Sequence, residues 1–126
     1  MKKYAIFLGS TLVGHTLLES ADAPMGVVAG KITFSIENPY ETIKSYCSLN
    51  NIALNEDDSD FKVIMTQPLP GIKVLSPNGI EIKGVGSTIN GMEEEGYSID
   101  IYGISYPFYG DEFPHHVKAY NENTFQ

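Results

Sequence analysis

The chain has 126 residues, the size of one domain spanning residues 1–126, and its sixteen acidic side chains against eight lysines give a net charge of −8. It contains no arginine, the side chain that most often grips phosphates and guanine edges, so the composition excludes a basic nucleic-acid-binding surface. The negative charge opposes binding to an anionic membrane and favours a basic protein partner, and no apolar run reaches the roughly 18 residues of a membrane-spanning helix.

The first 23 residues, MKKYAIFLGSTLVGHTLLESADA, allow two interpretations. Two lysines, an apolar run and a small-residue end are typical of a secretory signal peptide with its cleavage site. A signal peptide needs a continuous apolar core, however, and Gly9-Ser10 and Gly14-His15 both interrupt this one. We therefore predict strands at residues 4–8 and 11–18, with a turn near Gly9-Ser10, in a cytoplasmic protein. A single cysteine agrees with a reducing compartment.

The next two elements are a strand and the one clear helix. Residues 25–34 are rich in β-branched and aromatic side chains, which is typical of a strand. Asn38 can cap a helix whose first position is Pro39, so we predict a helix at about residues 39–50. Apolar residues recur along it at spacings of three and four and predict one buried stripe: Tyr40, Ile43 and Cys47.

Short strands follow the helix. We predict an acidic loop at residues 55–60 and then a strand at 61–66, which places alternate apolar residues on one face: Phe61, Val63 and Met65. Residues 72–75 and 80–83 flank Asn78-Gly79, a dipeptide that favours a tight hairpin turn.

The last third predicts a strand at residues 87–90, a charged turn at 93–95 and a strand at 97–104. The tail at 111–126 allows either a short helix from Pro114 or an extended segment. Seven or eight short strands with one main helix predict an α+β fold with a mostly antiparallel twisted sheet. Closure of that sheet into a barrel is not decided by the sequence.

Two groups of residues are candidates for acid–base chemistry. Glu19 and Asp22 are close in sequence, and paired carboxylates can act as general acid and base when their surroundings separate their pKa values. Alternatively, Asp22 organises a turn and Glu19 is solvated. His115 and His116 are adjacent, so on a helix or a strand they point in different directions and rarely bind one metal together.

The segment YSIDIYGISYPFYGDEF, residues 97–113, combines aromatic and acidic side chains. Tyrosine supplies a large contact area at low entropy cost, so this composition suits a protein-binding surface. The alternative is that half of these aromatics belong to the core. The residues we predict to contact a partner are Asp100, Tyr102, Tyr106, Tyr109, Asp111 and Glu112.

The run TLLESADAPMGVVAGKITF and the closing FPHHVKAY resemble a family of small bacterial proteins with a leucine–glutamate–x–x–aspartate–x–proline–methionine–glycine core motif. The resemblance spans most of the chain and implies no activity, cofactor or catalytic residue. It marks as the positions most worth testing Glu19, Asp22, Pro24, Met25, Gly26, His115 and His116.

No motif has the spacing that catalysis or a cofactor loop needs, so we expect a non-catalytic interaction protein without a cofactor. An acidic, tyrosine-rich domain suits a basic partner, by analogy with the immunity proteins that neutralise toxic enzymes. A homodimer is a competing use of the same surface. The alternative function is a small hydrolase, in one version assisted by a metal, that uses Glu19, Asp22 and one of His115 or His116.

Overall fold

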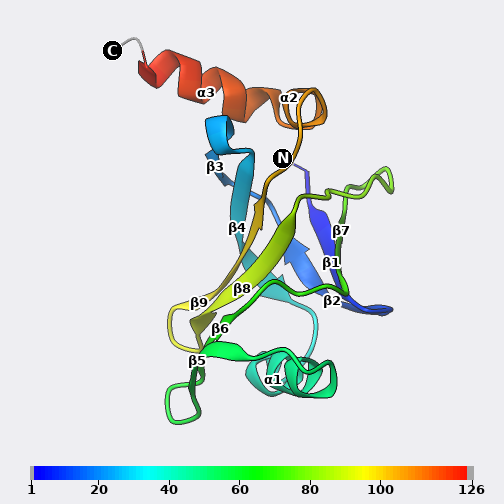
Figure 1. Cartoon of the computed structure of the whole chain (residues 1–126), viewed down its shortest axis with the longest axis vertical. Helices are drawn as coiled ribbons and strands as arrows, with labels where there is room; N and C mark the ends of the chain where they lie inside the picture. The colour runs from blue at the N-terminus through cyan, green and yellow to red at the C-terminus, as the bar shows by residue number, and fades with distance from the viewer. Residues whose placement is uncertain (1, 125–126) are drawn as a thin grey trace.

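The computed structural model describes residues 2–124, which contain nine strands, three helices and a short 3₁₀ turn (Figure 1). The strands are β1 (Tyr4–Leu8), β2 (Thr11–Thr16), β3 (Ser20–Asp22), β4 (Val27–Phe34), β5 (Leu54–Asp58), β6 (Val63–Thr66), β7 (Ile72–Leu75), β8 (Gly86–Met92) and β9 (Gly96–Tyr102). The helices are α1 (Pro39–Leu49), α2 (Phe108–Glu112) and α3 (Pro114–Thr124), and the 3₁₀ turn is η1 (Ala23–Met25). The predicted α+β class is confirmed.

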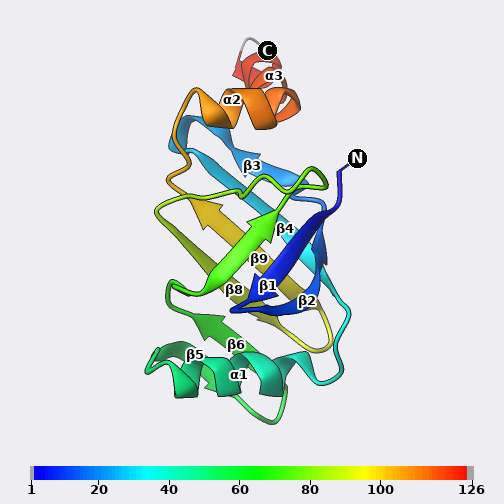
Figure 2. The same cartoon turned by 90° about the vertical axis from the view of Figure 1, so that its right-hand side faces the viewer.

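The strands form one antiparallel sheet in the order β5-β6-β8-β9-β4-β2-β1-β7, with β3 paired to β4. The sheet does not close into a barrel, because β5 and β7 remain as its edges. Helix α1 lies at one end of the sheet and helices α2 and α3 lie at the other (Figures 1 and 2). The two ends can therefore carry different surfaces. No helix within residues 2–124 is long and apolar enough to cross a membrane.

The predicted N-terminal strand pair is confirmed. Strands β1 and β2 pair across the turn at Gly9-Ser10 and contribute Ile6 and Val13, both fully buried, to the core. Strand β2 ends two residues earlier than expected, because Leu18 adopts a positive φ of 48° and turns the chain toward β3.

Strand β4 joins two parts of the sheet. Its first half pairs with β3 and β9, and its second half pairs with β2. The crossing requires glycine at Gly30, where a Cβ would collide with Thr16 Oγ1 and lie 2.6 Å from Glu19 Oε1. The segment that follows β2 can therefore pass directly over β4 only because this position has no side chain.

Helix α1 has the predicted limits to within a residue, and its predicted stripe is buried: Tyr40, Ile43 and Cys47. The expected side-chain cap is absent in the described structure. Asn38 adopts a left-handed φ of 54°, and its backbone carbonyl, rather than its side chain, accepts a hydrogen bond from the Thr42 N–H at 3.1 Å. The Tyr40 hydroxyl donates to Asp57 and so ties α1 to the edge strand β5.

The predicted acidic loop at residues 55–60 is wrong, because residues 54–58 form β5, which pairs with β6. An edge strand with one neighbour can present polar side chains to water, so its composition resembles that of a loop. In β6, Val63 and Met65 share a face as expected, but that face points outward, while Ile64 and Thr66 are buried.

The C-terminal half mostly follows the predictions. Ser76 and Ile80 close the expected hairpin by a 2.8 Å backbone hydrogen bond, although the returning arm makes only an isolated bridge rather than a full strand. In β9 the inward residues alternate as predicted: Tyr97, Ile99 and Ile101. The tail is helical from Pro114, and the short helix α2 before it was not predicted.

Candidate functional site

The two segments that carry the family resemblance meet at one end of the sheet, where α3 packs against β3 and η1 (Figure 1). The Nε2–H of His116 donates to the Leu18 carbonyl at 2.8 Å. The Tyr106 hydroxyl donates at 2.8 Å to the carbonyl of Ala23, the first residue of η1, and the Tyr109 hydroxyl donates at 2.8 Å to the carbonyl of Val27, at the start of β4. These bonds join side chains to backbone groups, so they fasten the C-terminal helices to the sheet.

The residues of the predicted hydrolase site are not joined to one another. The Glu19 carboxylate accepts a 2.9 Å hydrogen bond from the backbone N–H of Lys31. Within residues 2–124, no hydrogen bond or ion pair connects Glu19 or Asp22 to either His115 or His116. No three His, Cys, Asp or Glu side chains of this described range are placed to hold a metal ion. The hydrolase alternative therefore gains no support from the geometry.

The predicted partner-binding residues separate into exposed and internal members. Tyr109 is fully buried, and burial, followed by the nearby Tyr106 and Asp22, raises its pKa to about 12, so its hydroxyl remains a donor. Glu112 is only 8% exposed. Tyr106 is half exposed. The other members keep some accessible surface: Asp100, Tyr102 and Asp111. Tyr109 therefore offers no side chain to a partner. This agrees with the alternative that some aromatics of residues 97–113 belong to the core.

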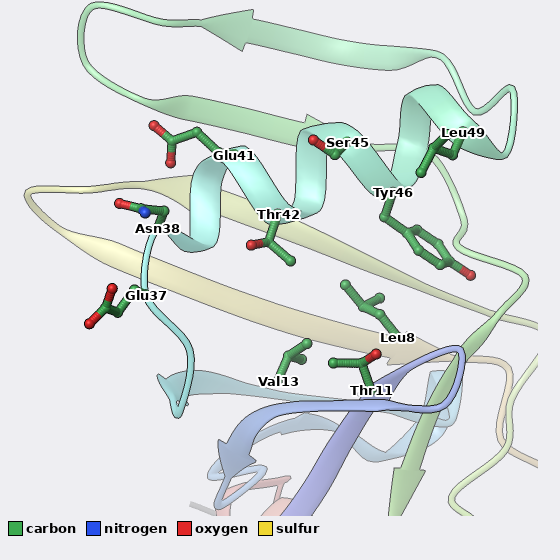
Figure 3. Close-up of a pocket in the computed structure, with 10 residues that line it drawn as sticks. All are labelled: Leu8, Thr11, Val13, Glu37, Asn38, Glu41, Thr42, Ser45, Tyr46 and Leu49. Carbon is green, nitrogen blue, oxygen red and sulfur yellow. The ribbon is translucent and has the colours of Figure 1, made fainter.

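A groove lies between α1 and the β1–β2 hairpin and has a volume of about 460 Å³. Leu8 and Val13 lie buried beneath it, and the half-buried Tyr46 ring on α1 contributes accessible apolar surface (Figure 3). Glu37 and Glu41 mark one end of the opening. The remaining lining residues are Thr11, Asn38, Thr42, Ser45 and Leu49. The groove is therefore apolar inside and acidic at one end.

More acidic side chains lie close to that end of the groove. Lys62 Nζ bridges Glu93 at 3.0 Å and Glu41 at 3.5 Å, which brings the β8–β9 turn next to the start of α1. The turn also carries Glu94 and Glu95. Burial, reinforced by the charges of Glu93 and Glu41, raises the pKa of Tyr97. The acidic end, defined as Glu37, Glu41 and Glu93–Glu95, therefore keeps a negative excess over its bridging lysine.

No family model, curated protein or solved structure matches this chain. The resemblance to the small bacterial family therefore stays a prediction. Any function has to follow from the residues and their arrangement.

Sequence reasoning missed the groove because two separate segments line it. The signal that could have indicated it is a second helical stripe beside the buried one, at spacings of three and four: Asn38, Glu41, Thr42, Ser45, Tyr46 and Leu49. That stripe mixes polar and apolar residues, so it is typical of a solvated helix face. Leu49, which is 83% exposed, is the one member whose chemistry contradicts that interpretation.

Cys47 is not a candidate nucleophile. It is buried on the inner stripe of α1, and burial raises the pKa of its thiol. We expect Ellman's reagent to modify Cys47 at least about 100-fold more slowly in the native protein than in urea, because reaction requires local opening. The rate of modification is followed by absorbance near pH 8, with and without urea. Equal rates in the two states would show that the thiol is accessible.

Proposed function

We propose that this protein is a non-catalytic interaction module of the bacterial cytoplasm that binds a basic segment of a partner protein in the α1 groove. The observation that carries the proposal is the combination of accessible apolar surface in the groove, from Leu49 and the half-buried Tyr46, with an acidic end beside it. An apolar side chain of the partner enters the groove, and a neighbouring lysine or arginine reaches Glu37 or Glu41.

The apolar contact supplies most of the affinity. Burying one apolar side chain contributes about 1.5–3 kcal/mol, whereas an exposed ion pair contributes at most about 1 kcal/mol. The charges act mainly on recognition: a net charge of −8 steers a basic partner toward the protein and repels acidic ones. This division of roles matches the physical type of an immunity protein that caps a basic enzyme, which is an analogy and carries no family assignment.

A matched pair of variants tests the groove. Leu49 and Val85 are both 83% exposed, but only Leu49 lines the groove. A labelled peptide in which leucines alternate with lysines serves as the probe, and its counterpart with glutamates serves as the control. We expect Leu49→Ser to weaken binding of the lysine peptide about fivefold and Val85→Ser to leave it unchanged, as measured by fluorescence anisotropy.

Charge variants test the acidic end separately. Replacing Glu37 and Glu41 together by glutamine should reduce the association rate of the lysine peptide and flatten its dependence on salt between about 50 and 500 mM. Equal affinity for the lysine and glutamate peptides would contradict the proposal. Light scattering on the protein alone is needed as well, because a dimer that Leu49→Ser dissociates would assign the groove to a second copy of this chain.

A further inference from the structure

A buried carboxylate lies at the opposite end of the molecule from the groove. One oxygen of Glu112, Oε2, accepts hydrogen bonds from Lys2 Nζ at 2.9 Å and from the Tyr4 hydroxyl at 2.7 Å. The other oxygen, Oε1, has no hydrogen-bond partner among the described residues. Since no fully buried side-chain oxygen or nitrogen of that range lacks a partner, Oε1 is reached by solvent.

The solvent that reaches this carboxylate occupies an open hollow of about 470 Å³. Lys2, Tyr4 and Glu112 form one side of it, and Asp111 and His115 contribute further polar groups. Apolar surface comes from Leu17 and Pro114. Glu112 is nine-tenths buried and only one of its two oxygens accepts hydrogen bonds from the described residues, so the other oxygen has accepting capacity left for a further donor. The hollow therefore offers a strong acceptor to a ligand.

The charges of the hollow decide the sign of that ligand. Asp111 and Glu112 carry two negative charges and Lys2 carries one positive charge, which is already paired with Glu112. Burial, the adjacent His116 and the positive charge of Lys2 together lower the pKa of His115, so its ring is mostly uncharged at neutral pH. The hollow keeps one net negative charge. A divalent metal does not fit, because no three suitable side chains converge in the described chain.

We propose that this hollow binds a small organic monocation, a primary alkylammonium. Its N–H groups donate to Glu112 Oε1 and to the Asp111 carboxylate, and its alkyl chain lies against Leu17 and Pro114. The Oε2 bonds from Lys2 and Tyr4 hold the carboxylate in place, so the acceptor is oriented before the ligand arrives. This site lies at the α2–α3 end of the molecule and does not depend on the α1 groove (Figure 2).

Titration of the intact protein with n-butylammonium, followed by amide NMR spectra, tests the site. Butyrate, which has the same number of carbon atoms and the opposite charge, is the matched control. We expect saturable shifts of the Leu17, Asp111 and His115 signals with n-butylammonium, with half-saturation on the order of millimolar for so small a ligand, and no such shifts with butyrate. Equal shifts with both probes, or no saturation with n-butylammonium, would overturn the proposal.

Three substitutions test whether n-butylammonium binds in the hollow. Asp111 is exposed, so Asp111→Asn should fold normally and weaken n-butylammonium binding about fivefold. Glu112→Gln should weaken it further, but this change also affects the bonds from Lys2 and Tyr4. Asp100→Asn removes a carboxylate on β9 outside the hollow and should leave binding unchanged. Binding by Asp111→Asn as tight as that of the unaltered protein would show that the hollow is not the site.

Discussion

Replacing Gly30 by alanine should lower the free energy of unfolding by about 3 kcal/mol. The added Cβ would collide with Thr16 Oγ1 and would lie 2.6 Å from Glu19 Oε1 and 2.8 Å from the Leu18 backbone nitrogen. The Leu18 nitrogen is backbone, and the Thr16 and Glu19 side chains both accept backbone hydrogen bonds, so none of the three can simply rotate away. The segment after β2 would have to lift from β4, which separates the two parts of the sheet.

Urea denaturation followed by circular dichroism measures this loss. Gly110→Ala is the matched control, because a Cβ there would meet only the Tyr106 ring at an ordinary 3.7 Å and Gly110 lies within helix α2. Alanine favours a helix over glycine, so this control should be neutral or stabilise by up to about 1 kcal/mol. Similar urea midpoints for the two variants would contradict the close approach of the segment after β2 to β4 at Gly30.

Replacing Phe113 by alanine should lower the free energy of unfolding by about 4 kcal/mol. Phe113 is fully buried, and its ring centroid lies 5.9 Å from that of Tyr4, 5.4 Å from Tyr109 and 5.8 Å from His116. It therefore joins the first strand, α2 and α3 in one aromatic cluster. Removing the ring leaves a cavity at the junction of all three, and the C-terminal helices should detach before the rest of the sheet unfolds.

Phe61→Ala provides the comparison, because Phe61 is 63% exposed and its truncation should change stability by no more than about 0.5 kcal/mol. Hydrogen exchange on Phe113→Ala should show lost protection in α3 and retained protection in β8 and β9. If Phe113→Ala lowered the free energy of unfolding as little as Phe61→Ala does, the role of the cluster would be contradicted. A uniform loss of hydrogen-exchange protection in Phe113→Ala would contradict it as well.

Local patterns were sufficient for several elements. The hairpin at residues 4–16 was readable because a two-residue turn separates two apolar runs, and α1 because its apolar spacing agrees with its cap and its proline. Strand β9 was readable because Tyr97, Ile99 and Ile101 alternate with polar residues. In each case the burial of a residue follows from neighbours within a few positions along the chain.

Local patterns did not predict the edge strand β5, the buried face of β6 or the short helix α2. Strand β5 is acidic and exists because β6 supplies its backbone partners, which no local pattern encodes. The outward face of β6 carries Met65, so hydrophobicity alone indicated the wrong side. Helix α2 spans only residues 108–112 and depends on the burial of Tyr109.

The sequence by itself determined the α+β class and the acidic character, because these depend on composition and on local periodicity. Only the tertiary structure decided which side chains meet. His116 reaches Leu18 across 98 positions, and Glu112 accepts from Tyr4 across 108. The groove likewise combines β1, β2 and α1. Contacts between such distant residues are set by how the sheet curls and where the helices pack, so the burial of Tyr109 and the open oxygen of Glu112 could not be inferred from the chain alone.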